Sequence, residues 1–248
     1  MLNEIDINEG SLYLGKKAGK EIFEKINKAK KSIKIITPYI SSEYVDLLKK
    51  KKRQGLIVKL IVSSDIGGDK DKNTSLKKLI SQKQNTNEKL KNKRDTALRV
   101  IKYSLLFAIL LTGTGIFYSV QKIQYAALVF VALYLARKYF SSLVIYSYTY
   151  YSELSLSIPM SPYTYGFDDE HTLTHTKLFI IDDESAYVGS INFTKSAFWK
   201  NYESRVKLTS SKVIDTLNKE FSYVFKNNST QYLDINIKGS YLYAEPPN

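Results

Sequence analysis

Residues 174–192 read THTKLFIIDDESAYVGSIN, and two runs within this segment are rich in apolar and β-branched residues. These runs, 176–181 and 186–193, are predicted to be β-strands joined by an acidic turn at 182–185. Because side chains alternate between the two faces of a strand, His175 and Lys177 share one face, and Ser190 and Asn192 share a face in the same way. If the two strands pair, these four side chains converge on one spot.

This set of side chains suits the chemistry of a phosphate diester. A histidine can act as a nucleophile or a general acid, while a lysine, a hydroxyl and an amide hold the anionic oxygens. Asp182 falls on the opposite face from His175 and Lys177, so we interpret it as a structural residue. The pattern therefore predicts a site for phosphoryl chemistry.

The segments on either side of the motif alternate between helix and strand. Before it, helices are predicted at 17–29 and 42–53, and strands at 32–37 and 56–63. After it, the sequence predicts a strand at 205–208, an amphipathic helix at 212–226 and a hairpin at 232–243. This alternation is typical of an α/β layered domain, in which the apolar strand 56–63 is buried on both faces.

The motif resembles that of the phospholipase D superfamily. The pattern HxKxxxxD is followed by GSxN and then by Asn-x-Glu, and the matching positions are His175, Lys177, Asp182, Gly189, Ser190, Asn192, Asn201 and Glu203. With one copy of the motif, the chain is similar to small bacterial endonucleases and to the mitochondrial phospholipase D/Zucchini group. The resemblance covers roughly residues 18–66 and 153–226 and implies a phospholipase D-like layered α-β-α domain.

The resemblance also implies a role for the polar residues of the motif. His175 is the nucleophile that forms a phosphohistidine, or the general acid in the partner subunit. Lys177 and Asn192 bind phosphate oxygens, and Ser190 contributes a hydrogen bond. Glu203 accepts a hydrogen bond from the His175 ring and sets its tautomer and basicity. The implied catalytic residues are therefore His175, Lys177 and Glu203.

The remaining matches, Asp182 and Gly189, are structural residues in this interpretation. Members of the superfamily work without metal, so we expect no metal site and no other cofactor. The pocket needs two catalytic histidines, and this chain has one copy of the motif, so a two-fold homodimer is implied. The chain has no cysteine and only two histidines, which excludes zinc ribbons, iron–sulfur clusters and thiol nucleophiles.

Two long apolar runs lie between the two parts of the predicted domain. Residues 103–120 carry no charge, and residues 123–136 form a second run after a short bridge. Such a pair predicts a transmembrane helical hairpin, and the alternative is a buried or dimerising hairpin of a soluble protein. Basic residues flank the pair on both sides, so the positive-inside rule predicts a membrane protein with a cytoplasmic catalytic domain.

The sequence thus predicts four parts. Residues 1–66 are the N-terminal part of the phospholipase D-like domain, and 67–102 are a basic polar linker or helix. Residues 103–140 are the transmembrane hairpin, and 141–248 are the C-terminal part with the catalytic motif. The formal charge is +6 for residues 1–66, +7 for 67–102, +2 for 103–166 and −2 for 167–248. A basic balance attracts nucleic acid or anionic lipid, and the charge alone does not separate them.

Three functions stay open at this point. The favoured one is a membrane-anchored nuclease that cleaves DNA or RNA through a phosphohistidine. The second is a phospholipase D or a phosphatidyltransferase of the cardiolipin type, and the third is an inactive membrane interaction module. The expected partners are a second copy of the chain, a phosphodiester substrate (nucleic acid or phospholipid) and the membrane.

Overall fold

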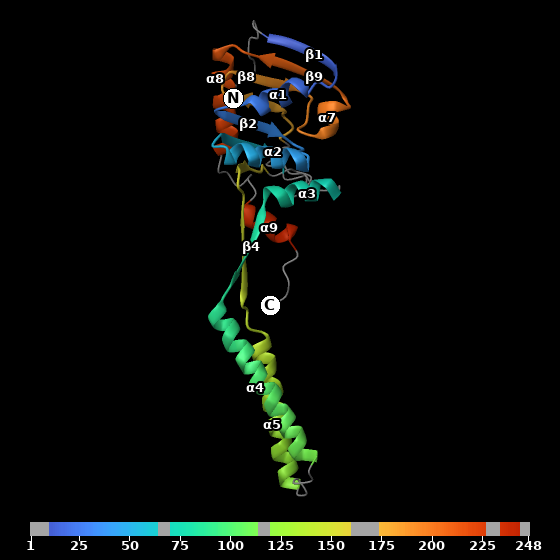
Figure 1. The fold of residues 1–248 in the computed structure, drawn as a ribbon, viewed down its shortest axis with the longest axis vertical. Helices are drawn as coiled ribbons and strands as arrows, with labels where there is room; N and C mark the ends of the chain where they lie inside the picture. Colours follow the sequence, from blue (N-terminus) through green and yellow to red (C-terminus); the bar gives the residue numbers. More distant parts are fainter. Residues whose placement is uncertain (1–9, 64–69, 114–119, 160–173, 227–233, 244–248) are drawn as a thin grey trace, which may run out of the picture. The chain divides into compact units, whose positions relative to one another are not determined.

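The computed structural model describes residues 10–63, 70–113, 120–159, 174–226 and 234–243 (Figure 1). The chain divides into two compact units. The first consists of Met1–Gln82 with Tyr150–Ala244, and the second of Lys83–Thr149 with Glu245–Asn248. All the residues predicted to form the site belong to the first unit, so its architecture decides how they are placed.

Seven strands of the described chain form the sheet of the first unit, in the order β1-β9-β8-β7-β2-β3-β6. The β2–β3 and β3–β6 pairs are parallel, whereas β2–β7, β7–β8, β8–β9 and β9–β1 are antiparallel. The strands are β1 Gly10–Lys16, β2 Ser32–Thr37, β3 Ile57–Val62, β6 Ser155–Ser157, β7 Leu178–Ile181, β8 Ser185–Gly189 and β9 Tyr202–Leu208. A parallel half therefore meets an antiparallel meander at the β2–β7 pair.

One face of this sheet is covered by α1 (Lys20–Lys28), α2 (Ser42–Arg53), α3 (Lys70–Leu79) and α7 (Lys195–Trp199). Ile22 and Ile26 of α1, four residues apart, lie on the same side of the helix and are buried. In α2 the buried residues include Val45 and Leu48, which join the same core cluster as Phe179 of β7. Figure 1 shows α1 and α2 in front of the strands.

The opposite face is covered by α8 (Ser211–Lys226). Ile214, Leu217 and Phe221 recur at the spacing of an amphipathic helix and pack with Leu178 and Ile180 of β7. Since alternate residues of β7 enter the two core clusters, the strand is buried on both faces. The structure therefore has the mixed α/β layers that the sequence predicts.

The acidic turn between β7 and β8 is fastened to the start of β2. The Asp182 carboxylate accepts backbone N–H bonds from Lys30 (2.9 Å), Lys31 (2.7 Å) and Ser32 (2.9 Å). Asp182 and Asp183 have φ of 55° and 58°, a left-handed conformation that Asp adopts more readily than most residues. Burial works to raise the pKa of Asp182, but these three backbone donors hold it below its ordinary value.

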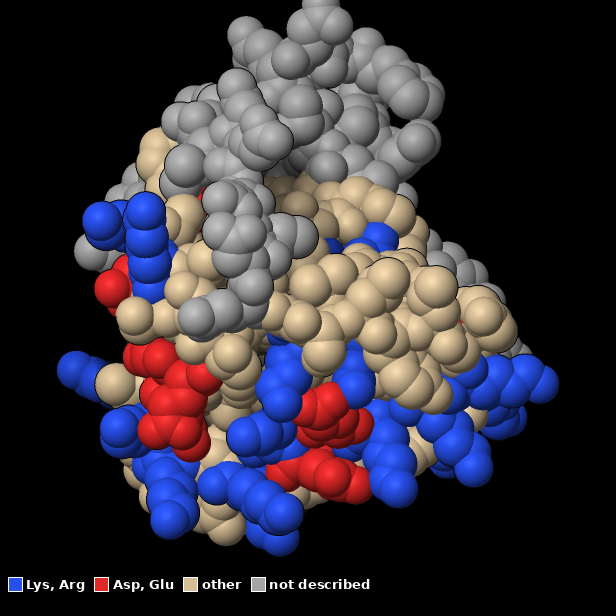
Figure 2. Space-filling model, turned by 90° about the horizontal axis from the view of Figure 1, so that it is seen from above, with Lys and Arg blue, Asp and Glu red and all other residues tan. Residues whose placement is uncertain are grey.

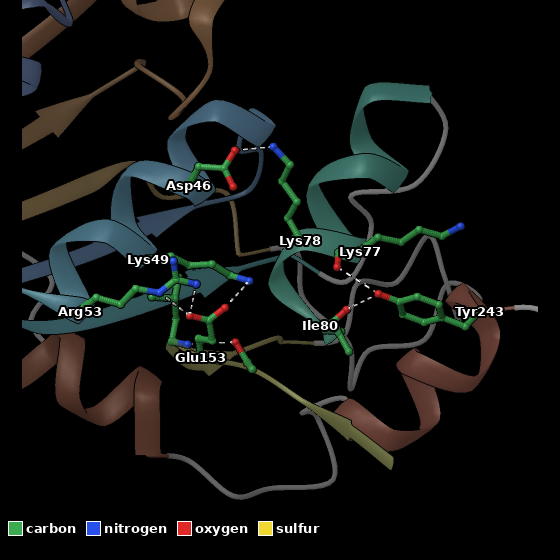
Figure 3. A network of polar contacts seen from close by, with 10 residues as sticks. Asp46, Lys49, Arg53, Lys77, Lys78, Ile80, Glu153 and Tyr243 are labelled. Atoms are coloured by element: carbon green, nitrogen blue, oxygen red, sulfur yellow. Dashed lines mark hydrogen bonds and ion pairs between the residues drawn. The ribbon is translucent and has the colours of Figure 1, made fainter. Parts of the chain in front are cut away.

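A second polar network joins α2 to the segment before β6 (Figure 3). Glu153 accepts a hydrogen bond from Arg53 at 2.8 Å and forms an ion pair with Lys49 at 3.0 Å. The Tyr243 hydroxyl lies 2.8 Å from the carbonyl oxygen of Ile80, which ties the C-terminal helix to the end of α3. Part of the basic run at the end of α2 is therefore engaged in holding the fold together.

The second unit contains α4 (Glu88–Gly113) and α5 (Val120–Ser141), which pack against each other, next to the paired strands β4 (Ser81–Thr86) and β5 (Tyr146–Tyr151). Of the helices that the structure describes, none combines the length and the apolar character needed to cross a membrane. The predicted transmembrane hairpin is therefore wrong. The predicted membrane localisation, with two transmembrane helices and a cytoplasmic catalytic domain, is wrong for the same reason.

The sequences of α4 and α5 explain why neither helix, as described, can cross a membrane. Of the uncharged run 103–120, the structure describes α4 up to Gly113 and α5 from Val120. The first half of α4 is strongly charged, with the sequence EKLKNKRD at its start. In α5 the uncharged part spans 123–136, about 21 Å at 1.5 Å per residue, against a hydrocarbon core of about 30 Å.

The end of the chain also differs from its prediction. Where the sequence predicts a hairpin at 232–243, the structure has the helix α9 (Ile235–Leu242). Asp234 caps this helix, since its side chain accepts the backbone N–H of Asn236 at 2.7 Å. Gly239 faces Tyr150 so closely that a Cβ atom there would lie 2.3 Å from its ring, so this glycine serves helix packing instead of a turn.

We expect Asp182→Ala to lower the free energy of unfolding by about 2–3 kcal/mol, because three backbone donors lose a charged acceptor. Asp182→Asn is expected to be milder, since an amide oxygen still accepts. The pKa of Asp182 is lower in the folded chain, so its contribution is complete above an unfolded-state pKa of about 3.9 and disappears as the pH falls through the folded value. Urea unfolding of wild type and Asp182→Asn from pH 7 to pH 2 checks this. A stability difference that stays constant down to pH 2 would contradict it.

Candidate active site

His175 and Lys177 lie immediately before β7, in an extended segment that enters the sheet at Leu178. His175 is exposed, whereas Lys177 is 7% exposed. The Lys177 Nζ atom donates to the backbone carbonyl of His175 at 2.7 Å and lies 2.8 Å from its Nδ1 and 3.1 Å from its Nε2. Because an ammonium group only donates, a ring nitrogen that accepts from Lys177 belongs to a neutral imidazole.

The Lys177 ammonium group is buried without an ion-pair partner among the described residues. Its partners there are the carbonyl and ring atoms of His175, which are neutral acceptors. Burial lowers the pKa of Lys177, and the negative charge of Glu203 opposes this lowering. A buried cation without a paired anion is unfavourable, so this position is suited to an anionic ligand.

Ser190 and Asn192 follow the end of β8, and the chain beyond them is fastened to β2. The Phe193 N–H donates to the Thr37 hydroxyl at 3.1 Å, and its carbonyl accepts from the Ser41 N–H at 3.0 Å. The Phe193 ring stacks on Tyr44 with centroids 4.5 Å apart. Asn192 is half-buried, and its Oδ1 atom has no hydrogen-bond partner among the described residues.

Glu203 lies near the start of β9, beyond the last paired residue of β8. Its carboxylate accepts a hydrogen bond from the Ser190 hydroxyl and another from the Asn201 side chain at 3.2 Å. The Ser190 hydroxyl in turn accepts the backbone N–H of Ser204 at 3.0 Å. Within the described residues, no hydrogen bond joins Glu203 to His175.

The sheet topology brings these two groups to one edge. Because β7 is antiparallel to both β2 and β8, the start of β7 lies beside the ends of β2 and β8. Because β9 is antiparallel to β8, the start of β9 lies at the same edge. His175 and Lys177 form one hydrogen-bonded group there, and Ser190 and Glu203 form the other.

The structure also gives roles to three polar residues to which the sequence reasoning assigned none. Thr37 is fully buried at the end of β2 and holds the backbone that follows Asn192. Ser204 fixes the Ser190 hydroxyl, and Asn201 fixes Glu203. Asn201 carried a sequence signal, since it belongs to the Asn-x-Glu pattern, whereas nothing in the sequence distinguishes Thr37 or Ser204 from other strand residues.

Comparison with protein families matches residues 22–101 and 138–225 to the family described as "Cardiolipin synthase, PLD-like domain". The two segments together span more than half of the chain, and the chain belongs to this family. It is a phosphodiesterase-like member of the phospholipase D superfamily, as its motif indicates. No curated protein matches the chain.

Solved structures similar to this chain include two bacterial proteins that the matches cover almost completely. Nuc from Salmonella typhimurium is 14% identical with a TM-score of 0.45, and the match covers 91% of this chain and 98% of Nuc. NucT from Helicobacter pylori is 14% identical with a TM-score of 0.48, covering 88% and 96%. Phosphatidylserine synthase from Haemophilus influenzae is 11% identical with a TM-score of 0.42, covering 91% of this chain and 39% of the synthase.

Gly189 allows the close approach of β8 and β9 next to this site. A Cβ atom at Gly189 would lie 2.1 Å from the carbonyl oxygen of Ser204 and 2.9 Å from the Cα atom of Arg205. Both neighbours are backbone atoms that belong to a paired strand, so they cannot turn away as a side chain does. The glycine is therefore needed where Ser190 leaves the sheet to reach Glu203.

We expect Gly189→Ala to lower the free energy of unfolding by about 3 kcal/mol or more, because the strands must separate to admit the methyl group. Gly55→Ala is the matched control. Gly55 has φ of 92° but no atom within 4 Å of the added Cβ, so only the backbone strain of about 1 kcal/mol remains. Urea unfolding of both variants measures the difference. Equal losses would show that crowding at Ser204 is unimportant.

Proposed function

We propose that the chain hydrolyses phosphodiesters of nucleic acids through a covalent phosphohistidine at His175, without a metal ion. The buried Lys177 ammonium beside the His175 ring is the observation that carries this proposal. It combines a nucleophile with a positive charge that lacks a paired anion within the described residues. A phosphate diester supplies that anion and presents its phosphorus to the ring.

In the proposed first step, Lys177 exchanges its contact with the His175 ring for a phosphoryl oxygen. The freed ring nitrogen attacks phosphorus, a P–N bond forms, and the bond to the leaving oxygen breaks. The leaving oxygen takes a proton from His175 of a second copy of the chain. Water then attacks phosphorus and gives its proton to that second histidine, and the P–N bond breaks to restore the first.

The other motif residues have supporting roles in this proposal. Asn192 binds the phosphoryl oxygens with its amide group. Its Oδ1 atom, which lacks a hydrogen-bond partner in the part of the chain that the structure describes, supports a place for a further donor at the site. Ser190 and Glu203 form a hydrogen-bonded pair that supplies negative charge close to Lys177. In this proposal, Glu203 turns toward the His175 ring once substrate has displaced Lys177 from it.

The family description supports a second candidate, phosphatidyl transfer or hydrolysis of phospholipids, since it names a cardiolipin synthase. The same residues serve both reactions, because each breaks a phosphodiester bond. The experiment therefore offers the purified protein single-stranded DNA, double-stranded DNA, RNA and phosphatidylglycerol vesicles, each in EDTA. Cleavage of nucleic acid supports the first candidate, and lipid products without nucleic-acid cleavage support the second.

We expect His175→Ala to abolish turnover and Lys177→Ala to reduce kcat by about 1,000-fold, as for the loss of one charged oxyanion donor. Glu203→Gln is expected to be milder, because it perturbs the reacting groups without removing one. Acid-labile phosphorus label trapped on wild type, but not on His175→Ala, checks the covalent step. Activity that is lost in EDTA, restored by magnesium and unaffected by His175→Ala would refute the mechanism. Absence of turnover on all four substrates would favour an inactive chain.

The need for a second histidine predicts a homodimer. Equal amounts of wild type and His175→Ala, mixed and allowed to exchange subunits, should keep about one quarter of the activity of the same total amount of wild type, because only wild-type dimers hold both histidines. Light scattering on the same samples gives the oligomeric state. Half of the activity, or a strictly monomeric and fully active protein, would contradict this prediction.

A further inference from the structure

Five lysines surround the sheet edge that holds the candidate site: Lys16, Lys17, Lys20, Lys195 and Lys200. We propose that they bind the sugar–phosphate backbone of a polynucleotide on one side of the scissile phosphate. This inference rests on the proposed function, since it concerns how a strand reaches His175. It identifies the substrate as a polymer of phosphates and not as a single phospholipid headgroup.

Three of these lysines come from the connection between β1 and α1. In the β1–β9 pair, Gly15 lies opposite Glu203 and Lys16 lies opposite Tyr202, so β1 ends where the candidate site begins. Lys17 follows with φ of 62°, and its carbonyl accepts the N–H of Lys20 at 3.0 Å. This tight turn holds the three lysines together at the edge of the sheet.

The other two lysines lie on the segment that joins Asn192 to Glu203. Lys195 begins α7, and Lys200 is the residue that follows its end. The two lysine-bearing segments are in direct contact, because a Cβ atom on Gly19 would lie 2.3 Å from the ring of Phe198. The five lysines therefore come from two segments that touch each other beside the site.

The charge of this surface is not neutralised within the described chain. All five lysines are exposed, and none of them forms an ion pair with another described residue. Glu21, the carboxylate nearest in sequence to Lys20, is already paired with Arg205 and Lys207. Figure 2 shows Lys and Arg side chains around two groups of acidic side chains on one face of the molecule.

Residues 186–208 also contain more basic than acidic residues. Their only carboxylate is Glu203, against Lys195, Lys200, Arg205 and Lys207. The net charge of −2 over residues 167–248 hides this, because acidic residues are concentrated elsewhere, as in the turn at 182–184. Two lysines near that turn are paired, Lys34 with Asp183 at 2.8 Å and Lys31 with Glu184 at 3.8 Å. The site end of the β7–β8 hairpin is therefore basic, whereas its turn is acidic.

The width of this surface fits a polynucleotide. From His175 before β7 to Lys16 at the end of β1, the edge crosses β7, β8, β9 and β1, which are successive neighbours in the sheet. Three strand spacings amount to about 14 Å, or about four nucleotides at 3.4 Å per nucleotide. Tyr202 lies within this distance, is 73% exposed and offers a ring for base stacking. A headgroup with a single phosphate does not extend so far.

The test uses binding and does not require turnover. In a His175→Ala background, the affinity for a fluorescein-labelled 20-nucleotide single strand is measured by anisotropy from 50 to 300 mM NaCl. The variant carries Lys16→Gln, Lys17→Gln and Lys20→Gln. If each lysine contacts a phosphate, the slope of log K against log salt becomes shallower by about 2, because each contact contributes about 0.7. We expect at least about tenfold weaker binding at 100 mM NaCl.

The matched control carries Lys25→Gln, Lys28→Gln and Lys30→Gln, which remove the same charge from exposed lysines beside the Asp182 turn. This control should keep the slope and affinity of the parent. Equal losses of affinity and salt slope in the two triple variants would overturn the proposal, because they would show that DNA is attracted to the net positive charge of the protein and not to a particular surface. An unchanged slope in the first variant would overturn it as well. Thermal melting confirms that each variant is folded.

Two further measurements separate this inference from the proposed function. If wild type cleaves DNA and the salt slope of the lysine variant is unaltered, the proposed phosphodiesterase activity stands and the proposed lysine surface is refuted. If the salt slope changes but no substrate is cleaved, the lysine surface stands and the proposed activity is refuted. Binding of phosphatidylglycerol vesicles that is lost in the Lys16, Lys17 and Lys20 variant, while DNA binding is retained, would assign the surface to lipid and overturn the inference.

Discussion

The Asp182 carboxylate, with its three backbone donors at the start of β2, is the contact on which the placement of the site depends. It joins residues that are about 150 positions apart in the sequence, and so fixes β7 against β2. A slip of one residue in this pairing would exchange the two faces of β7, so that Phe179 would enter the core cluster beneath α8 and Leu178 would enter the cluster beneath α1 and α2. The contact of Asp182 with the start of β2 therefore determines on which face of the sheet Lys177 lies.

At the end of the β7–β8 hairpin opposite its turn, the chain must leave the sheet so that polar groups can reach a substrate. Gly189 is the last paired residue of β8, and its missing side chain lets the Ser204 carbonyl come close. Beyond Gly189 the chain leaves the sheet. There the Thr37 hydroxyl accepts the Phe193 N–H, and the Ser41 N–H donates to the Phe193 carbonyl. A rigid hairpin fastened at its turn thus presents polar groups at its open end.

Lys177 shows why a fold retains a feature that does not favour its stability. Burying an ammonium group costs free energy, and the structure offsets this with a carbonyl oxygen, a ring nitrogen and the field of Glu203. None of these is a paired carboxylate. An anion that completes the arrangement gains more from Lys177 than it does in water, because the surrounding protein is less polarisable.

The sequence by itself determined the local elements and the motif. Alternating and 3.6-residue apolar patterns gave β2, β3 and α8 close to their observed bounds, because these segments bury one face or both in any layered fold. The family followed from the spacing of His175, Lys177 and Asp182. The apolar runs of α4 and α5 misled the prediction, because the described α4 also includes a strongly charged first half and the uncharged part of α5 is short.

Only the tertiary structure decided which groups meet. At the site end, β7 begins later and β8 ends earlier than predicted, so Lys177, Ser190 and Asn192 lie just outside the strands, as His175 does. That Lys177 contacts the His175 ring, that Ser190 contacts Glu203, and that the β1–α1 lysines reach the same edge all depend on pairings between distant segments. Local propensity carries no information about such pairings, because their free energy arises only when the sheet is assembled.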